Sequence, residues 1–265
     1  MAVSTKPRQR RGRGTEDPLC FGASSWARLR PRPEPRPSSA TATSAEITLK
    51  GSIAIITEFF NYSINSILYQ RGIYPPESFS RSSKYGLTVL TSDDEELKVY
   101  LKQIMGQMEK WMTDGDVERL VVVVTGVDSG ETLERWQFNV SVQEEKEEVK
   151  GMETDENGNT LNVEKTKEKM EKKSGKSLQE IHFEISALIR QITASVTFLP
   201  LLNEPCSFDL LIYTKKDASV DTSAWEDSDP RYIVNSSEVK LRSFTTSVHK
   251  VDSCVAYKEK DEWDL

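Results

Sequence analysis

Four acidic side chains, Asp93, Asp94, Glu95 and Glu96, follow one another in the sequence and are of a type that can hold a divalent cation. No histidine or further acid lies near them in the sequence, and an apolar helical pattern begins directly after them. Carboxylates in the first turn of a helix are favoured by its dipole. We therefore predict a helix start here, with Ser92 as its cap, and no metal site.

Other candidate chemistry is equally sparse. Residues 155–160, DENGNT, are similar to the start of a calcium loop but lack Gly at the sixth position, and Thr166 stands where the bidentate Glu belongs. The two histidines, His182 and His249, have neither a neighbouring nucleophile nor metal-ligand spacing. Phosphate-loop, dinucleotide-binding and serine-hydrolase patterns do not occur in the sequence. We therefore expect no enzyme and no cofactor.

The three cysteines, Cys20, Cys206 and Cys254, are widely spaced and odd in number. This usage indicates a reducing compartment and neither a disulfide framework nor a zinc site. The chemistry that remains is binding. Either the protein captures an extended peptide at a sheet edge, or it is a nucleic-acid adaptor that uses a basic segment.

Charge is distributed unevenly along the 265 residues. The net charge is −7, with +5 in residues 1–46 and −12 in the remainder. An acidic body argues against nucleic-acid binding by the folded part. The longest aliphatic run, residues 120–124, is too short for a membrane span, and residues 1–46 contain no apolar signal-peptide core.

Composition also divides the chain. Residues 1–46 are rich in Arg, Pro, Ser and Thr and are expected to be a disordered basic tail. Residues 143–176 are dominated by charged residues, Asn and Gly, which predicts a long loop, and residues 259–265 form an acidic end. One domain, residues 47–258 with the loop inside it, remains.

Helical periodicity marks three segments of this domain. Residues 177–202 carry apolar residues at 3.6-residue spacing for nearly six turns, and we expect them to form the central helix, ended by Pro200. Residues 51–70 form a second helix, with more than half of its circumference apolar. The third begins after Ser92 and has an apolar stripe that reaches Trp111.

Strand patterns occupy most of the rest. A core strand beneath the central helix is expected at residues 206–214. After Thr214 the sequence has charges and no clear helical or strand period. Other strands are predicted at residues 47–49, 85–91, 118–125, 132–142, 238–248 and 249–258. The predicted fold class is α+β, with three helices packed on a mostly antiparallel sheet.

Several segments are similar to one known family. They are ITLKGS from residue 47, EFFNYSINSILYQRGIYP from residue 58, LERWQF from residue 133, IRQITASVTFLPLL from residue 189, CSFDLLIYT from residue 206 and LRSFTTSVHKVDSCVAYK from residue 241. Together they closely resemble the spindle-assembly-checkpoint branch of the HORMA-domain proteins. The departures are the basic tail, the enlarged loop, an apparent extra residue near residues 218–224 and the terminal DEWDL.

The resemblance implies a HORMA fold that holds a closure-motif peptide as an added strand, with residues 214–258 as a mobile safety belt over it. It also implies two conformers, open and closed, that differ in where the N-terminal strand and the C-terminal segment pair. The implied partners are the checkpoint protein mitotic arrest deficient one and the activator subunit of the anaphase-promoting complex. Sequestration of that activator in the nucleus, at kinetochores and in the cytoplasm would delay anaphase until kinetochores attach. The alternative is a HORMA adaptor of translesion DNA polymerase zeta or another peptide-capturing module.

Particular residues follow from the same resemblance. Arg190 and Gln191 would form the self-association surface of an open–closed dimer, with Phe198 and Arg71 close to it. The residues alone leave open whether Arg190 and Gln191 lie on a solvated helix face or on a partner-binding face. Residues implied in the belt and its switch are Leu49, Trp225, His249 and Tyr257.

Overall fold

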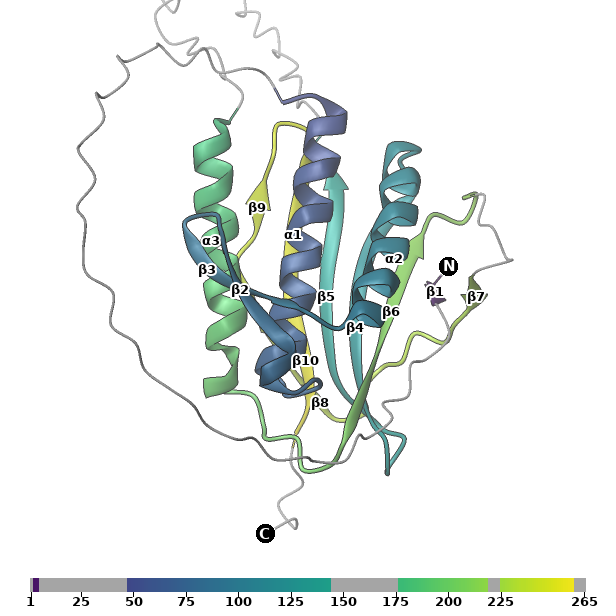
Figure 1. The fold of residues 1–265 in the computed structure, drawn as a ribbon. Coiled ribbons are helices and arrows are strands. Elements are labelled where there is room, and N and C mark those ends of the chain that lie inside the picture. The colour runs from purple at the N-terminus through teal and green to yellow at the C-terminus, as the bar shows by residue number, and fades with distance from the viewer. Residues whose placement is uncertain (1, 5–46, 144–175, 219–224, 260–265) are drawn as a thin grey trace, which may run out of the picture.

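The computed structural model describes residues 2–4, 47–143, 176–218 and 225–259. Within these ranges three α-helices cover one face of an antiparallel sheet (Figure 1). The helices are α1 (Leu49–Gln70), α2 (Glu95–Thr113) and α3 (Leu178–Ala194), with short 3-10 turns η1 (Pro76–Ser78) and η2 (Ser195–Thr197). The expected tail beyond residue 4, the loop at 144–175 and the end at 260–265 lie outside the described residues.

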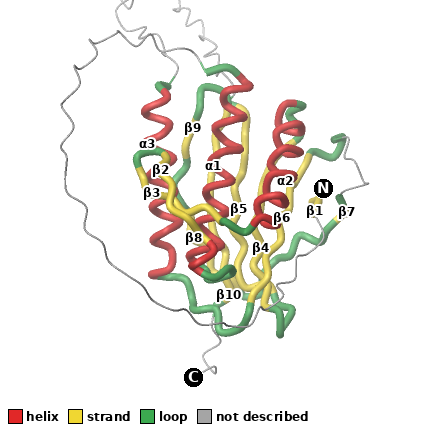
Figure 2. The backbone as a smooth tube through the Cα atoms, in the orientation of Figure 1, coloured by secondary structure: helices red, strands yellow, loops and turns green. Residues whose placement is uncertain are grey.

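The main sheet has the order β7-β1-β6-β4-β5-β10-β8, and β9 also pairs with β10. Every neighbouring pair is antiparallel. Its strands are β1 (Ala2–Ser4), β4 (Val117–Gly126), β5 (Thr132–Val142), β6 (Cys206–Thr214), β7 (Glu226–Asp227), β8 (Ser236–Lys240), β9 (Phe244–Thr245) and β10 (His249–Lys258). A separate hairpin joins β2 (Phe79–Lys84) to β3 (Leu87–Ser92) and crosses in front of the helices (Figure 2).

The middle helix is α1, which packs against both α2 and α3. The prediction that residues 177–202 form the central helix is wrong, because α3 lies at one side and ends at Ala194, before the η2 turn. Its start is defined by a capping box between Ser177 and Glu180. The strand β6 is not beneath α3 but on the α2 side of the sheet (Figure 1). There the rings of Tyr100 and Phe208 lie 6.0 Å apart.

Helix starts account for two further differences. The predicted strand at residues 47–49 is wrong, because Thr48 caps α1 and its Oγ1 accepts a hydrogen bond from the Gly51 amide at 3.2 Å. The cap of α2 is Asp94 rather than Ser92, and its carboxylate accepts from the Leu97 amide at 2.7 Å. A side-chain acceptor at the right offset outweighed the weak strand pattern.

Strand boundaries agree best where the apolar pattern is strongest. The predicted bounds of β5, β6 and β10 are confirmed, and β4 extends one residue beyond each predicted end. The strand expected at residues 85–91 begins instead at Leu87, because Tyr85 and Gly86 form a turn with φ of 51° and 69°. The β2 strand before that turn was missed. The single strand predicted at residues 238–248 is wrong, because this range holds the end of β8 and the whole of β9, with a break between them.

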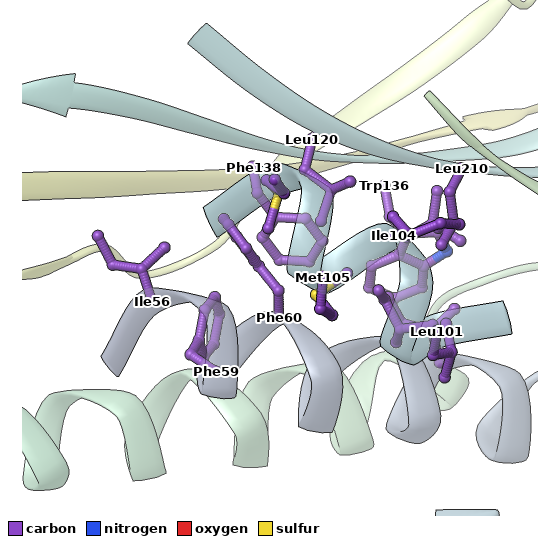
Figure 3. Packing of buried hydrophobic residues seen from close by; sticks show 14 of the residues in the cluster. Ile56, Phe59, Phe60, Leu101, Ile104, Met105, Leu120, Trp136, Phe138 and Leu210 are labelled. Atoms are coloured by element: carbon purple, nitrogen blue, oxygen red, sulfur yellow. The ribbon is translucent and has the colours of Figure 1, made fainter. Parts of the chain in front are cut away.

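Aromatic side chains of α1 meet the sheet in the core (Figure 3). Phe59 and Phe138 form an edge-on pair with ring centroids 5.8 Å apart, and Phe59 contacts Phe244 at 4.8 Å. All three rings are buried. A smaller cluster of Val121, Val123 and Leu211, with Tyr213 packed against it, is separate from this main core. No helix within the described ranges is long and apolar enough to cross a bilayer.

Candidate functional site

A strand position lies at the β6 edge of the main sheet. The strand in it, β1, pairs with β6 through Ala2↔Tyr213, Val3↔Ile212 and Ser4↔Leu211. On its other side β1 pairs with β7, through Val3↔Asp227 and Ser4↔Glu226. We call this position the strand slot: the place between residues 211–213 of β6 and residues 226–227 of β7. An extended backbone in the slot is hydrogen-bonded on both sides.

The chain then returns across the sheet. The strand β7 lies at one end of the strand order and β8 at the other, so residues 228–235, the crossing segment, must span the sheet between them. They do so on the face that carries Tyr213. The Pro230 carbonyl accepts from Arg135 Nε at 3.2 Å and from the Tyr213 hydroxyl at 3.4 Å. The crossing segment therefore lies over the sheet on the side away from the helices.

Charged and aromatic side chains hold the crossing segment on this face. Arg135 donates to the Tyr213 hydroxyl at 2.9 Å, and its guanidinium lies 5.1 Å from the centre of the Tyr232 ring. Arg231, at a φ of 50°, places its guanidinium 3.9 Å from Asp209, whose pKa is raised by burial. Sequence reasoning missed Arg135 and Asp209 as functional candidates. Their alternation with core-facing Trp136 and Leu210 along β5 and β6 was the available signal.

The C-terminal strand β10 closes the far side of the sheet. It pairs with β5 from His249↔Val142 to Tyr257↔Glu134 and with β8 from Cys254↔Lys240 to Lys258↔Ser236. Tyr257 therefore has a partner on both sides and packs against the main core. This double pairing fixes the end of the segment that began at β7.

Trp225 anchors the segment just before β7. Its ring is buried and lies 4.9 Å, centroid to centroid, from the ring of Trp111 on α2. Trp111 is likewise buried, as expected for a core residue. The contact attaches the outer wall of the strand slot to the helix layer.

His249 joins β10 to the start of α1. Its Nδ1 lies 2.7 Å from the Ser52 hydroxyl, which in turn lies 2.7 Å from the Thr246 hydroxyl. All three groups are buried, and burial lowers the pKa of His249. Leu49 lies in the first turn of the same helix and is 45 % exposed. The structure thus brings His249, but not Leu49, into a buried network.

Two of the residues expected for self-association, Arg190 and Gln191, lie on α3, and a third, Phe198, follows the η2 turn. Arg190 is exposed, and so are two apolar side chains, Phe183 on the same helix at 69 % and Phe198 after the η2 turn at 41 %. Gln191 is half-buried and its Oε1 accepts from the Arg242 amide at 2.7 Å, so it also fixes α3 to the segment after β8. Arg190 and Phe198 remain available to a partner.

Arg71 points inward rather than onto that surface. Its Nε donates to Glu134 at 2.6 Å and a terminal nitrogen donates to the Pro200 carbonyl at 2.5 Å. Only 5 % of the Arg71 side chain is exposed. Arg71 can therefore act on the loop after α3 only through the Pro200 carbonyl, not by direct contact with a partner.

Covalent chemistry is not favoured at the two described cysteines. Burial raises the pKa of both thiols, Cys206 on β6 and Cys254 on β10, to about 11. They are protonated at neutral pH and poor nucleophiles. What the site provides is a backbone ladder, closed by a segment of the same chain.

Fold and site together define a domain that can hold an extended strand at its sheet edge and enclose it with its own C-terminal segment. The sequence profile of the HORMA domain matches residues 52–249. The chain therefore belongs to the HORMA-domain family, and the expected fold of three helices on an antiparallel sheet is confirmed.

Within this family the chain is a homologue of spindle-checkpoint proteins. The mitotic spindle assembly checkpoint protein MAD2A of Dictyostelium discoideum is 52 % identical over 212 residues, which cover 80 % of this chain and 93 % of the relative. A chain in the crystal structure of a mitotic checkpoint complex matches with a TM-score of 0.64 at 44 % identity, covering 79 % of this chain and 99 % of that one. The resemblance to the checkpoint branch, mitotic arrest deficient two, is confirmed.

More distant structures share the fold. The Caenorhabditis elegans protein HTP-1, solved with a HIM-3 closure motif bound, has a TM-score of 0.61 at 15 % identity, over 80 % of this chain and 92 % of that one. The fold therefore extends to proteins with little sequence similarity to this chain.

Proposed function

We propose that this protein is a spindle-assembly-checkpoint adaptor that captures closure-motif peptides as an added β-strand in the strand slot. The observation that carries the proposal is the pairing of a strand between β6 and β7, with the chain returning across the sheet to β8. Solved relatives in checkpoint and closure-motif complexes support it. Residues 214–258 act as the safety belt.

We infer that the described arrangement is the closed, peptide-holding state. Because the belt leaves β6 on one side of the slot and is fixed by β8 and β10 at the far edge, a ligand strand is enclosed rather than laid on an open edge. Backbone pairing supplies affinity with little dependence on the ligand's side chains. Trp225, Arg135 and Tyr257 hold the belt at three separate places.

The ligands are the closure motifs of mitotic arrest deficient one and of the activator subunit of the anaphase-promoting complex. Capture of the activator in the nucleus and cytoplasm, promoted at kinetochores, delays anaphase. The α3 face with Arg190, Gln191 and Phe198 pairs an open with a closed copy. Support comes from the checkpoint relatives and from the exposure of Arg190 and Phe198.

The test is titration of the full chain with a labelled closure-motif peptide of mitotic arrest deficient one. We expect saturable binding that Trp225→Ala weakens at least about tenfold, because removal of a buried aromatic anchor typically costs more than about 1.4 kcal/mol. The control is Val99→Ala, at a 54 % exposed position on α2, which should bind like the parent. Absence of peptide binding to the parent would refute the proposal, and equal weakening by both substitutions would refute the role of the belt.

A further inference from the structure

The strand in the slot belongs to the chain itself. Residues Ala2–Ser4 pair with β6 on one side and with β7 on the other. Without an occupant, residues 211–213 of β6 would present a row of unpaired backbone groups, which is the usual weakness of an edge strand. The segment therefore satisfies the same backbone groups that an external peptide would use.

Charge favours the same occupant. The outer wall of the slot, Glu226–Asp227, is acidic and exposed. The sequence that directly follows β1 is basic, with Lys6, Arg8, Arg10, Arg11 and Arg13. Opposite charges on the two partners favour association and set its orientation.

Chain length permits the intramolecular arrangement. Forty-three residues separate Ser4 from Thr48, the cap of α1. Fully extended they could span about 140 Å, whereas α1 is about 33 Å long. A segment tethered in this way competes with external ligands at an effective concentration that does not fall on dilution.

We propose that Ala2–Ser4 is an internal ligand of the strand slot, which an external closure-motif peptide must displace. The inference rests on the proposed function, since it assigns an occupant to the same slot. It makes the N-terminal segment a regulator of capture: when the internal strand is in place, the slot is closed to partners. The apparent affinity for an external peptide is then reduced by the fraction of molecules whose slot is free.

The substitution Val3→Pro tests the inference in the full chain. Proline has no amide hydrogen to donate, and a strand paired on both sides does not accommodate it. Val3→Ile is the matched control, because it keeps an amide and a β-branched side chain. We expect Val3→Pro to bind a labelled peptide of residues 1–13 of this chain, added in trans, while the parent and Val3→Ile do not. We also expect Val3→Pro to bind the partner's closure-motif peptide about tenfold more tightly than the parent.

A structural readout accompanies the binding assays. Hydrogen exchange of those amides of residues 211–213 and 226–227 that point into the slot should be faster in Val3→Pro than in Val3→Ile, with an unchanged thermal midpoint because the main core is not involved. Faster exchange throughout the sheet, with a lowered midpoint, would mean that β1 is a structural strand and would overturn the inference.

The two peptides separate the two claims. If the partner's closure-motif peptide binds the parent and Val3→Pro equally, and the peptide of residues 1–13 binds neither, the internal ligand is wrong and the capture function stands. If only the peptide of residues 1–13 binds Val3→Pro, the internal ligand is supported and the capture of external partners is wrong. If neither peptide binds any variant, both claims fail.

Discussion

Arg71 and Glu134 form a charged pair in the interior, with 5 % and 2 % of their side chains exposed. Burial raises the pKa of Glu134, and the opposing effects come from Arg71 and from the Trp136 indole, which donates to the carboxylate at 3.0 Å. The pair links the end of α1 to β5 and, through the Pro200 carbonyl, to the loop after α3. At the residue scale such a pair positions other elements, and its net contribution to stability depends on both members being present.

The first prediction concerns removal of one member. Arg71→Ala leaves a buried carboxylate without its cation and should lower the free energy of unfolding by about 3–5 kcal/mol. The double substitution Arg71→Met with Glu134→Leu should lose much less, because no unpaired charge remains. Urea denaturation of the parent, both single variants and the double variant gives the coupling energy. Additive losses would show that the two side chains act independently.

A second prediction uses His249. Because burial lowers its pKa below the ordinary value of 6.5, His249 is neutral in the folded protein and takes up its proton on unfolding. The unfolded state then binds more protons as the pH falls through 6.5, so stability is full above that value and declines below it. The raised pKa of Glu134 has the opposite effect on stability, because it makes the folded state bind more protons as the pH falls. The contribution of His249 is therefore obtained by comparing its variant with the parent.

The measurement is the free energy of unfolding between about pH 7.5 and 5 for the parent and for His249→Gln. Ser52→Ala serves as a control that keeps the titrating group. We expect the decline toward low pH to be shallower in His249→Gln, and Ser52→Ala to lose about 1–3 kcal/mol for the unpaired partner. The assignment would be contradicted by parallel curves for the parent and His249→Gln.

At the element scale, α3 and β10 have separate tasks. The inner apolar stripe of α3 is part of the main core, while Arg190 is exposed on its outer face. The strand β10 is paired along both edges and so fixes the C-terminal end of the segment proposed as the belt. A change on the outer face of α3 should therefore alter association, and a change in β10 should alter capture.

Charge reversal on α3 tests the first of these. Arg190→Glu should abolish self-association and leave peptide binding intact, because exposed substitutions usually change stability by no more than about 0.5 kcal/mol. Arg190→Lys keeps the charge and is the matched control. Gln191 is left unchanged, since its Oε1 bonds the Arg242 amide within the chain. Sedimentation of a clearly dimeric parent beside an equally dimeric Arg190→Glu variant would exclude this face.

Shortening β10 tests the second. Deletion of residues 256–265 removes Ala256, Tyr257 and Lys258, which pair with Glu238, Ser237 and Ser236 of β8. The belt then keeps only part of its attachment, so we expect faster release of a bound closure-motif peptide and a shift toward the open form. Deletion of residues 260–265 alone leaves every described pair of β10 and is the control. An unchanged dissociation rate in both truncated proteins would rule out β10 as the latch.

For the whole molecule, the belt joins the two edges of one sheet. If residues 214–258 enclose a ligand as proposed, its release requires separation of β10 from β5 along the register from His249 to Tyr257, together with movement of the crossing segment. Such a rearrangement breaks a packed layer and should be far slower than the microseconds in which a hairpin forms.

The corresponding prediction is that the purified protein exists as two species that exchange over minutes to hours. Closure-motif peptide should drive the population to one species, and a change from 1:99 to 99:1 requires a preference of about 5.5 kcal/mol. Val3→Pro, which removes the internal ligand, should shift the starting population toward the open species. Ion-exchange chromatography followed over time measures both. A single species whose elution the peptide does not change would contradict a two-state switch.

The sequence by itself determined the elements whose apolar pattern is strong, because periodicity depends only on which face of a helix or strand is buried. The bounds of β5, β6 and β10 and the stripe of α2 could be predicted in this way. The family was also recognisable, since its motifs persist over residues 47–258. The start of α2 at the acidic run followed from the dipole and the cap rules, although the cap is Asp94 and not the predicted Ser92.

Only the tertiary structure decided how these elements combine. The middle position of α1 depends on contacts with both other helices, and the inward direction of Arg71 depends on Glu134, 63 residues away. The expectation that residues 1–46 lack secondary structure is wrong at Ala2–Ser4, because three residues have too short a pattern to predict a strand. What makes them a strand is the backbone of β6, more than two hundred residues later, and local sequence does not encode a partner at that distance.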